Sequence, residues 1–355
     1  MINSNGNGAS LPSGRRFRAL ITGGAGFLGS HLAEALLKKK HEVLILDDLS
    51  TGNIENIHSL KEYGGMQYWI DSLTNRSLLA ELVDDSDIIF HLAAAVGVRL
   101  IVESPVHTIE TNVSGTELVL KAANKKKKPV FLASTSEVYG KSTQVPFRED
   151  DDLVLGTTTK GRWSYAASKV LDEFLALAYW KEKKLPVIVA RFFNIVGPRQ
   201  SGRYGMVFPN FVSNAIANSD VTVFGNGLQT RCFCYVGDVV QAVLRLVEAP
   251  ASVGQIFNIG NDREISIENL AQMIIQRLGS KSKIRHISYE QAYEEGFEDM
   301  FRRLPSLEKI KQSIGWHPET PLETCIDLIA RSFEQPTHEQ RGKLVSPQSS
   351  FAVGL

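Results

Sequence analysis

The stretch from Leu20 to Ser30 constrains the fold of this chain more than any other part of its sequence. It reads Leu-Ile-Thr-Gly-Gly-Ala-Gly-Phe-Leu-Gly-Ser, follows an apolar run and precedes a helical pattern of apolar residues. We therefore expect a strand, a tight turn and a helix. Such a turn needs glycine for three reasons: the backbone must take positive φ, it must approach a pyrophosphate closely, and the helix must pack against the strand. The spaced glycines are Gly23, Gly26 and Gly29. The free amides at the start of the helix would bind the phosphates.

A carboxylate lies at the end of the next apolar run. Asp47 follows Val43-Leu-Ile-Leu46 and comes eighteen residues after Gly29, the spacing at which an acid binds the ribose hydroxyls of a dinucleotide. No arginine follows Asp47 directly, which favours NAD over NADP as the cofactor. The predicted cofactor-binding residues in this part of the chain also include Phe27, Leu28 and Asp48.

Strand-like runs alternate with helical patterns along the first half of the chain. We expect further strands at 68–70, 87–92, 129–133 and 187–191, the last of these as the final parallel strand, and helices at 73–82, 106–122 and 163–183. This alternation predicts an α/β fold of Rossmann type, a doubly wound parallel sheet with helices on both faces. Ligands of such a fold bind beyond the carboxyl ends of the strands.

Shorter elements after residue 194 predict a smaller α/β region that binds the substrate. We assign 17–194 to the NAD-binding Rossmann domain and 195–335 to this second region, which is interleaved with the first. The polar segments 1–16 and 336–355 are expected to be disordered.

Composition excludes several classes of partner. Lys and Arg together number 39, as do Asp and Glu, so no net charge attracts nucleic acid or an acidic membrane, and an anionic ligand must be bound locally. We find neither an apolar targeting segment nor a run long enough to span a bilayer. Cys232, Cys234 and Cys325 suggest neither a disulfide framework nor a zinc site. We expect a cytoplasmic protein without a bound metal.

Residues beyond the predicted strand ends are further candidates for the cofactor site. The small residues after strand 87–92 would let a flat ring system lie on the backbone. Asp71, after strand 68–70, could accept a hydrogen bond from the adenine amino group or could cap the helix that follows, and the sequence leaves both roles open. The candidates are Asp71, Ser72, Leu92, Ala93, Ala94 and Asn112.

Tyr165 and Lys169 lie four residues apart at the start of a predicted helix. This spacing places a phenol and an ammonium on one helical face. Because a nearby cation stabilises the phenolate and lowers the pKa of the phenol, Tyr165 could act as a base near neutral pH. We predict that both residues belong to the catalytic site and also contact the cofactor.

Arginines near the turns of the second half of the chain are candidates for binding phosphates or a substrate carboxylate. A planar guanidinium matches the geometry of both groups. An ordinary surface salt bridge is the alternative for each of them. These residues are Arg199, Arg231, Arg302 and Arg303.

Four motifs taken together resemble those of the extended short-chain dehydrogenase/reductases that rebuild nucleotide sugars. The resemblance extends from about residue 17 to residue 333. Segments 160–165, 229–233, 257–260 and 293–305 also resemble bacterial UDP-glucuronate decarboxylase domains and plant UDP-apiose/UDP-xylose synthase. The four motifs are Gly23-x-x-Gly26-x-x-Gly29, Thr135-Ser-Glu137, Tyr165-x-x-x-Lys169 and Arg191-Phe-Phe-Asn194.

The resemblance implies a UDP-sugar substrate and an NAD that is regenerated within each cycle. Tyr165 would take the proton of the sugar's 4-hydroxyl, Lys169 would hold the cofactor ribose, and Thr135 would orient the 4-oxygen. A ketone at carbon 4 makes a carboxylate on carbon 5 that of a β-keto acid, which loses carbon dioxide readily. The residues expected to bind the substrate are Asn194, Arg199, Arg231, Tyr293 and Arg302.

Glu137 distinguishes the possible reactions. The resemblance implies an acid at or next to this position in decarboxylases and 4,6-dehydratases, and a small or hydroxylic residue in 4-epimerases. Ser136 matches the decarboxylase serine, where the apiose-forming enzymes have cysteine, and Arg303 matches an arginine near the substrate carboxylate. We therefore expect decarboxylation of UDP-glucuronate, then 4-epimerisation of UDP-glucuronate or a UDP-hexose, and 4,6-dehydration third.

A dinucleotide sensor without catalytic activity is the alternative from another class of protein. It is disfavoured because a sensor has no reason to keep both Tyr165 and Lys169. The resemblance also implies a homodimer, formed through the helix that ends near Lys125 and the helix that bears Tyr165.

Overall fold

The structure, a computed structural model, describes residues 14–96, 104–202, 206–288 and 300–334. Residues 1–13 and 336–355 of the segments expected to be disordered lie outside these residues, as does the candidate substrate residue Tyr293. Within the described part of the chain, no helix has both the length and the apolar character needed to cross a membrane.

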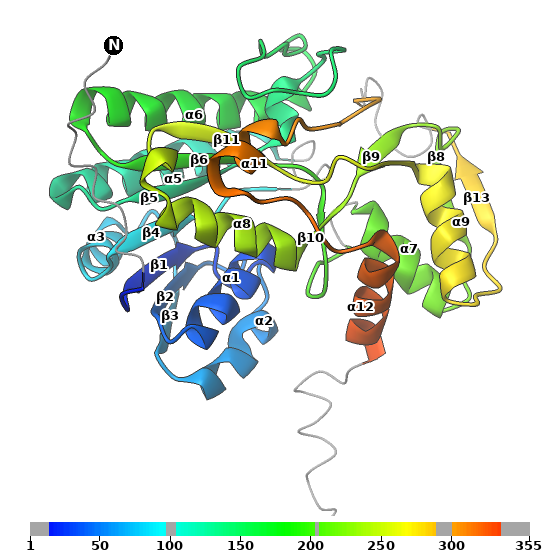
Figure 1. Cartoon of the computed structure of the whole chain (residues 1–355), viewed down its shortest axis with the longest axis horizontal. Coiled ribbons are helices and arrows are strands. Elements are labelled where there is room, and N and C mark those ends of the chain that lie inside the picture. The colour runs from blue at the N-terminus through cyan, green and yellow to red at the C-terminus, as the bar shows by residue number, and fades with distance from the viewer. Residues whose placement is uncertain (1–13, 97–103, 203–205, 289–299, 335–355) are drawn as a thin grey trace, which may run out of the picture.

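A seven-stranded sheet forms the centre of the larger part of the molecule (Figure 1). Its strand order is β11-β6-β5-β4-β1-β2-β3, and every pairing in it is parallel. Because the order reverses between β1 and β4, the sheet is doubly wound, and the predicted Rossmann-type fold is confirmed. The strands are β1 (Arg18–Thr22), β2 (Glu42–Asp47), β3 (Met66–Ile70), β4 (Ile88–His91), β5 (Val130–Thr135), β6 (Val187–Phe192) and β11 (Gln255–Ile259).

The inner strands of this sheet are covered on both faces. All four residues of β4 are buried, and in β1 and β2 only the first residue is partly exposed. Such strands need near-continuous apolar runs, which is why these segments are rich in valine, isoleucine and leucine. The edge strand β3 is mostly exposed by contrast.

Strand β11 corrects the prediction that 187–191 is the last parallel strand. It pairs with β6, with Ile259 opposite Phe192, and its residues Phe257 and Ile259 are buried in the main core. The second half of the chain therefore contributes one strand to the main sheet. The boundary at residue 194 between two functional regions stays a prediction.

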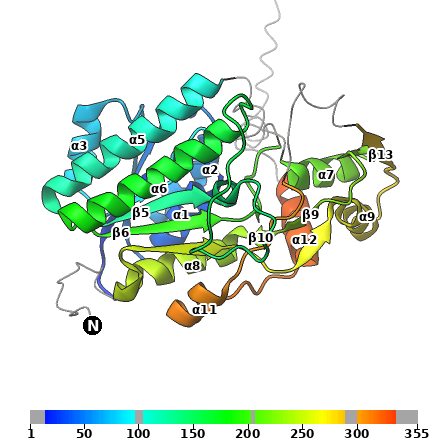
Figure 2. The same ribbon diagram turned by 90° about the horizontal axis from the view of Figure 1, so that it is seen from above.

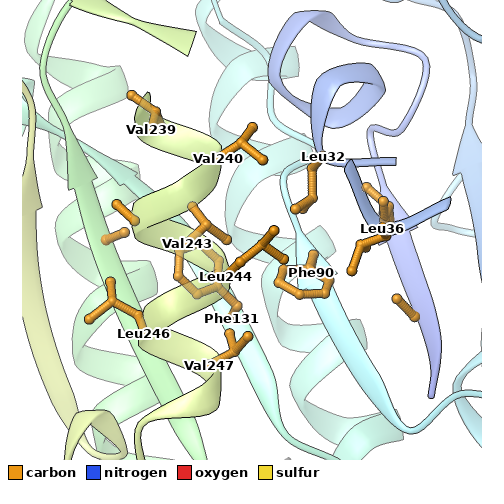
Figure 3. Packing of buried hydrophobic residues seen from close by; sticks show 14 of the residues in the cluster. Leu32, Leu36, Phe90, Phe131, Val239, Val240, Val243, Leu244, Leu246 and Val247 are labelled. Carbon is orange, nitrogen blue, oxygen red and sulfur yellow. The ribbon is translucent and has the colours of Figure 1, made fainter. Parts of the chain in front are cut away.

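Helices pack on both faces of the sheet, and Figure 2 shows α5 and α6 lying side by side on one of them. On the opposite face, Leu32 of α1 lies close to Val240 and Leu244 of α8, above Phe90 and Phe131 of the sheet (Figure 3). The first face carries α3 (Arg76–Asp84), α5 (Pro105–Lys126) and α6 (Trp163–Lys183); the second carries α1 (Phe27–Lys38), α8 (Val236–Glu248) and α11 (Glu308–Ile314).

A smaller region built around its own apolar core lies beside the main sheet (Figure 1). Its strands form three two-stranded pairs, of which only β9 with β12 is antiparallel among the described residues. The elements are β7 (Ile195–Val196), α7 (Val207–Ile216), β8 (Val221–Phe224), β9 (Thr230–Cys232), β10 (Cys234–Tyr235), β12 (Glu264–Ser266), α9 (Ile267–Arg277), β13 (Ile284–Ile287) and α12 (Leu322–Glu334). Short helices α2 (Glu55–His58), η1 (Ser59–Tyr63), η2 (Ser136–Tyr139) and η3 (Pro250–Ser252) complete the described elements.

Candidate active site

The turn after β1 and the first turn of α1 have no room for side chains at Gly23 and Gly29. Gly23 has φ +73°, and a Cβ on it would lie 2.7 Å from the amide nitrogen of Ala93. A Cβ on Gly29 would lie 2.2 Å from the carbonyl oxygen of Gly23. Gly26 is the N-cap of α1, and no side chain of the described residues caps this helix. The loop and helix end therefore have the open backbone that a pyrophosphate requires.

The Asp47 side chain, at the end of β2, is hydrogen-bonded to this loop. Its Oδ2 accepts a hydrogen bond from the Ala25 amide at 2.8 Å, and its Oδ1 accepts one from the Leu49 amide at 2.9 Å. Burial raises the pKa of the Asp47 carboxyl, and these two amides oppose the rise. Asp48 is exposed, and its Oδ1 accepts from the Ser50 amide at 2.9 Å. The predicted contacts with a ribose stay predictions.

The end of β3 shows how the cap of the following helix is built. Helix α3 begins after its N-cap Asn75, whose Oδ1 accepts from the Leu78 amide at 3.2 Å. Asp71 does not cap the helix itself; its Oδ2 accepts from the Asn75 side-chain amide at 2.7 Å, and its Oδ1 accepts from the Ser72 amide at 2.7 Å. Asp71 therefore orients the capping residue, and the adenine contact predicted for it stays a prediction.

Asn112 of α5 connects the loop after β4 to α6. Its Oδ1 accepts from the Ala95 amide at 2.8 Å, and its side-chain amide donates to the Ser168 hydroxyl at 3.1 Å. The Leu92 amide donates to the carbonyl of Thr22 at 3.1 Å. Leu92 is thereby tied to the end of β1, and the backbone of Ala93 lies beside Gly23. Phe27 and Leu28, in the first turn of α1, pack against the apolar core.

Thr135, Glu137 and Tyr165 come together where β5 ends and α6 begins. Thr135 is the last residue of β5, and its hydroxyl accepts from the Glu137 amide at 3.2 Å. Tyr165 is buried at the start of α6, with a side-chain hydrogen bond to Thr135. Burial raises the pKa of the Tyr165 phenol above its usual range, the Glu137 carboxylate adds to the rise, and the Thr135 hydrogen bond opposes it.

The structure does not bear out the expectation that Lys169 lowers the pKa of the Tyr165 phenol. The Lys169 ammonium donates to Oδ2 of Asp172 at 2.8 Å, and the two side chains are 3% and 0% exposed. Asp172, three residues further along α6, raises the pKa of Tyr165. The expected lowering of the phenol pKa by Lys169 is therefore not found in this structure, where burial and the Glu137 and Asp172 carboxylates raise that pKa. Asp172 was missed in the sequence, although its spacing of three from Lys169 was a visible signal.

Two arginines hold Glu137. Its Oε1 lies 2.6 Å from Nη1 of Arg303, and its Oε2 lies 3.2 Å from Nη2 of Arg162. Arg162 immediately precedes α6 and was also missed, although it comes three residues before Tyr165. Ser136 is buried in η2. The structure thus brings Thr135, Glu137 and Arg303 together with the tyrosine, as the resemblance implied.

The other arginine candidates make protein contacts. Arg199 pairs with Glu34 of α1 at 2.6 Å, and Arg302 pairs with Glu264 of β12. Nη1 of Arg231 donates to the Thr230 carbonyl at 2.8 Å, and the Asn194 carbonyl accepts from the Cys234 amide at 3.2 Å. For Arg199 and Arg302, the salt-bridge alternative is realised in this structure. Their substrate contacts stay predictions.

A second ion pair, also missed in the sequence, supports the strand ends behind the site. Arg191 of β6 donates from Nη2 to Oε2 of Glu173 at 2.7 Å, and the Ser134 hydroxyl donates to Oε1 of Glu173 at 2.5 Å. This pair joins α6 to β5 and β6.

The described ranges contain no cluster of three or more histidine, cysteine, aspartate or glutamate side chains that could hold a metal.

Comparison with known proteins places the chain among enzymes of nucleotide sugars. A family model described as GDP-mannose 4,6 dehydratase matches residues 20–329. The chain is 45% identical over 319 residues to a UDP-N-acetyl-alpha-D-glucosaminuronate decarboxylase of Bacillus cytotoxicus. The match covers 90% of this chain and 98% of the relative. It is 34% identical to UDP-glucuronic acid decarboxylase 1 of Xenopus tropicalis, over 94% of this chain and 76% of the relative.

Among solved structures, the chain resembles UDP-glucuronic acid 4-epimerase from Bacillus cereus in complex with UDP-glucuronic acid and NAD. The TM-score is 0.80 at 26% identity, and the match covers 89% of this chain and 99% of the epimerase chain. The chain belongs to the family described as GDP-mannose 4,6 dehydratase, within the extended short-chain dehydrogenase/reductases.

Proposed function

We propose that this protein is an NAD-dependent decarboxylase of a UDP-linked hexuronate that acts through a 4-keto intermediate. The observation that carries the proposal is the contact of Arg303 with Glu137 at 2.6 Å, in the same site as Tyr165 and Thr135. A guanidinium there offers a planar cation to a carboxylate on carbon 5 of the sugar. The decarboxylase names of relatives at 45% and 34% identity support the same reaction.

The residues around the glycine loop fit NAD. The backbone at Gly23, Gly26 and Gly29 would hold the pyrophosphate at the start of α1, and Asp47 and Lys169 would hold the two riboses. The complex of the Bacillus cereus epimerase with NAD supports this cofactor. When bound, NAD accepts hydride from carbon 4 of the sugar and later returns it.

Side chains of the site supply the proton transfers and the binding. Tyr165 would take the proton of the 4-hydroxyl as a phenolate, which the positive charge of the nicotinamide ring would favour when NAD is bound, and Thr135 orients the 4-oxygen through its hydroxyl. Arg303 binds the substrate carboxylate before it leaves as carbon dioxide, and the electron pair of the broken bond passes to carbon 5 and the 4-oxygen as an enolate. Carbon 5 then gains a proton from water, which the Glu137 carboxylate would relay, and the 4-ketone is restored. Tyr165 returns its proton to the 4-oxygen in the final reduction.

Two uronates are candidate substrates, because the relatives differ in the sugar that their names give. UDP-glucuronate is the substrate that the sequence predicts, and the Xenopus relative supports it. UDP-N-acetylglucosaminuronate is the second candidate, favoured by the 45% identity to the Bacillus cytotoxicus decarboxylase. Incubation of the protein and NAD with each uronate in parallel, followed by mass spectrometry, ranks them. A nucleotide product that has lost carbon dioxide supports the proposal, and unchanged mass with both uronates contradicts it.

The 4-epimerisation of a UDP-uronate or UDP-hexose is the alternative reaction. The TM-score of 0.80 to a UDP-glucuronic acid 4-epimerase supports this reaction. The same 4-keto uronate can rotate in the site and take hydride back on its other face without losing its carboxylate. A product of unchanged mass but altered carbon 4 configuration, detected by proton NMR, would favour this reaction. The 4,6-dehydration in the name of the family model ranks third, because that reaction has no carboxylate for Arg303 to bind.

Tyr165→Phe separates an enzyme from a sensor. We expect this variant to bind NAD but to lose turnover, because phenylalanine cannot accept the proton. Unchanged turnover would refute Tyr165 as the base. A parent protein that binds NAD but converts no nucleotide sugar would favour the sensor.

We also propose a homodimer formed through α5 and α6. Val106 and Ile109 on α5 are 66% and 42% exposed, and Leu171 and Phe174 on α6 are 50% and 67% exposed. The two helices lie side by side (Figure 2), so these apolar side chains offer a joint surface for a second copy. Light scattering at micromolar concentration tests the proposed homodimer.

We also propose a cytoplasmic location, because the three cysteines are free and buried.

A further inference from the structure

Lys169 and Asp172 form an ion pair inside α6, next to the proposed base. The ammonium lies 2.8 Å from Oδ2 of Asp172, and the side chains are 3% and 0% exposed. Lys169 lies about one helical turn and Asp172 about two turns after Tyr165, the residue that Lys169 was expected to ionise. In this position the Asp172 carboxylate raises the pKa of the Tyr165 phenol, so the pair does not favour the phenolate.

The neighbouring titratable groups do not compete for the charges of this pair. Glu173, the next residue of α6, is engaged by Arg191 at 2.7 Å, and Glu137 of η2, which acts on Tyr165, is engaged by Arg303 at 2.6 Å. His91 of β4 is fully buried, and burial together with the charge on Lys169 lowers its pKa to about 3. This histidine is therefore neutral near pH 7.

Hydroxyl groups complete the surroundings of the pair. The His91 ring nitrogens lie 3.2 Å from the Thr116 hydroxyl of α5 and 2.8 Å from the Thr22 hydroxyl of β1. Thr116 also faces Asp172: burial raises the pKa of that carboxyl, and Lys169 and the Thr116 hydroxyl oppose the rise. Among the described residues, Asp172 is therefore the acid that supplies the charge opposite Lys169.

Removing that charge would leave an ammonium buried with no counter-ion. Buried lysines without an opposite charge lose their proton, with pKa values several units below normal. A neutral lysine is a poorer hydrogen-bond donor to a ribose. The binding of a dinucleotide through Lys169 would then depend on pH in a range where a paired lysine does not titrate.

We propose that Asp172 is a positioning residue that keeps the Lys169 ammonium charged and directed along α6, ready to bind the cofactor ribose, without ionising Tyr165 in the resting protein. The inference rests on the NAD binding proposed above, and it assigns a role to a residue that touches neither cofactor nor substrate.

The first test is the NAD affinity of the full chain between about pH 6 and about pH 9, measured by calorimetry for the parent and for Asp172→Asn. Asparagine keeps the shape and one oxygen acceptor but removes the charge. We expect nearly constant affinity in the parent and a fall of about tenfold with rising pH in Asp172→Asn, because the uncompensated lysine loses its proton. Equal affinity at every pH, or a loss that does not vary with pH, would overturn the proposal.

Two control variants accompany this measurement. Asp327→Asn removes the charge of a partly exposed aspartate on α12 that pairs with Arg277 of α9 at 2.6 Å, and it should bind NAD as the parent does. Lys169→Met should bind NAD weakly at every pH, and adding Asp172→Asn to it should produce no pH dependence. A pH dependence in the double variant would show that a group other than Lys169 titrates.

A second measurement uses the parent itself and therefore does not depend on how a variant folds. The ¹³C resonance of the Lys169 ε-carbon, assigned by its loss in Lys169→Arg, should keep the shift of a charged lysine to above about pH 9. A titration midpoint below that pH would overturn the proposal. A parent that does not bind NAD would contradict the proposed function, whereas a parent that binds it while Asp172→Asn shows no pH dependence would contradict only the role of Asp172.

Discussion

Alanine in place of Gly29 should weaken NAD binding because the new methyl group has no room. Its Cβ would lie 2.2 Å from the Gly23 carbonyl oxygen, about 1.2 Å inside the 3.4 Å at which ordinary contact begins, and 2.7 Å from the Gly24 Cα. These neighbours are backbone atoms, so the loop must move. Overpacking of this kind costs about 1–3 kcal/mol, against a gain of up to about 1 kcal/mol from alanine in a helix.

We therefore expect Gly29→Ala to lose about 1–2 kcal/mol of stability. Because the displaced backbone would no longer fit the pyrophosphate, we also expect a loss of at least about tenfold in NAD affinity, or about 1.4 kcal/mol. The matched control is Gly115→Ala on α5, where the nearest atom is the flexible Leu73 Cδ1 at 3.2 Å. This variant should be as stable as the parent or slightly more stable, with unchanged NAD affinity. Urea denaturation and calorimetry measure both quantities. Parent-like NAD affinity in Gly29→Ala would refute the placement of the pyrophosphate on this loop.

Three further predictions follow from other parts of the molecule. Burial lowers the pKa of His31 from 6.5 to about 4. Between these pH values the unfolded chain therefore binds more protons than the folded chain. The parent should lose up to about 3 kcal/mol of stability as pH falls from about 6.5 to about 4. His31→Gln should reduce that slope, and an unchanged slope would contradict this cause. Arg303→Met should weaken binding of a UDP-uronate by about tenfold to a hundredfold and leave UDP binding unchanged; equal loss for both would argue against carboxylate recognition. Phe174→Glu should give a monomer by light scattering, and a persistent dimer would place the interface elsewhere.

The parts of the fold that follow from local patterns were predictable from the sequence. The inner strands are apolar runs, so β1, β2 and β4 were found close to their true positions. The glycine loop was predictable because its spacing of glycines is a local signature: Gly23 takes a positive φ, and Gly29 has no room for a Cβ beside Gly23 and Gly24. Strand β11 was not assigned to the main sheet, because its pairing with β6 joins segments more than sixty residues apart and leaves no local signature.

The residues of the candidate site were predicted better than their interactions. Tyr165 and Lys169 were found from their spacing, but the sequence could not show that the ammonium turns toward Asp172 instead of the phenol. Both partners are reachable from one helix, and only the tertiary surroundings decide between them. The pairing of Arg199 with Glu34 joins residues 165 positions apart, and such a contact depends on how α1 and the second half of the chain meet.

The release of carbon dioxide by the protein loaded with NAD tests the central claim most directly. UDP-glucuronate and UDP-N-acetylglucosaminuronate are supplied separately, and the rate is compared between the parent and Tyr165→Phe with NAD occupancy checked in each. The account predicts release from at least one uronate by the parent, and a rate lower by about a thousandfold in the variant with NAD still bound. No release from either uronate, or an equal rate in the variant, would contradict it.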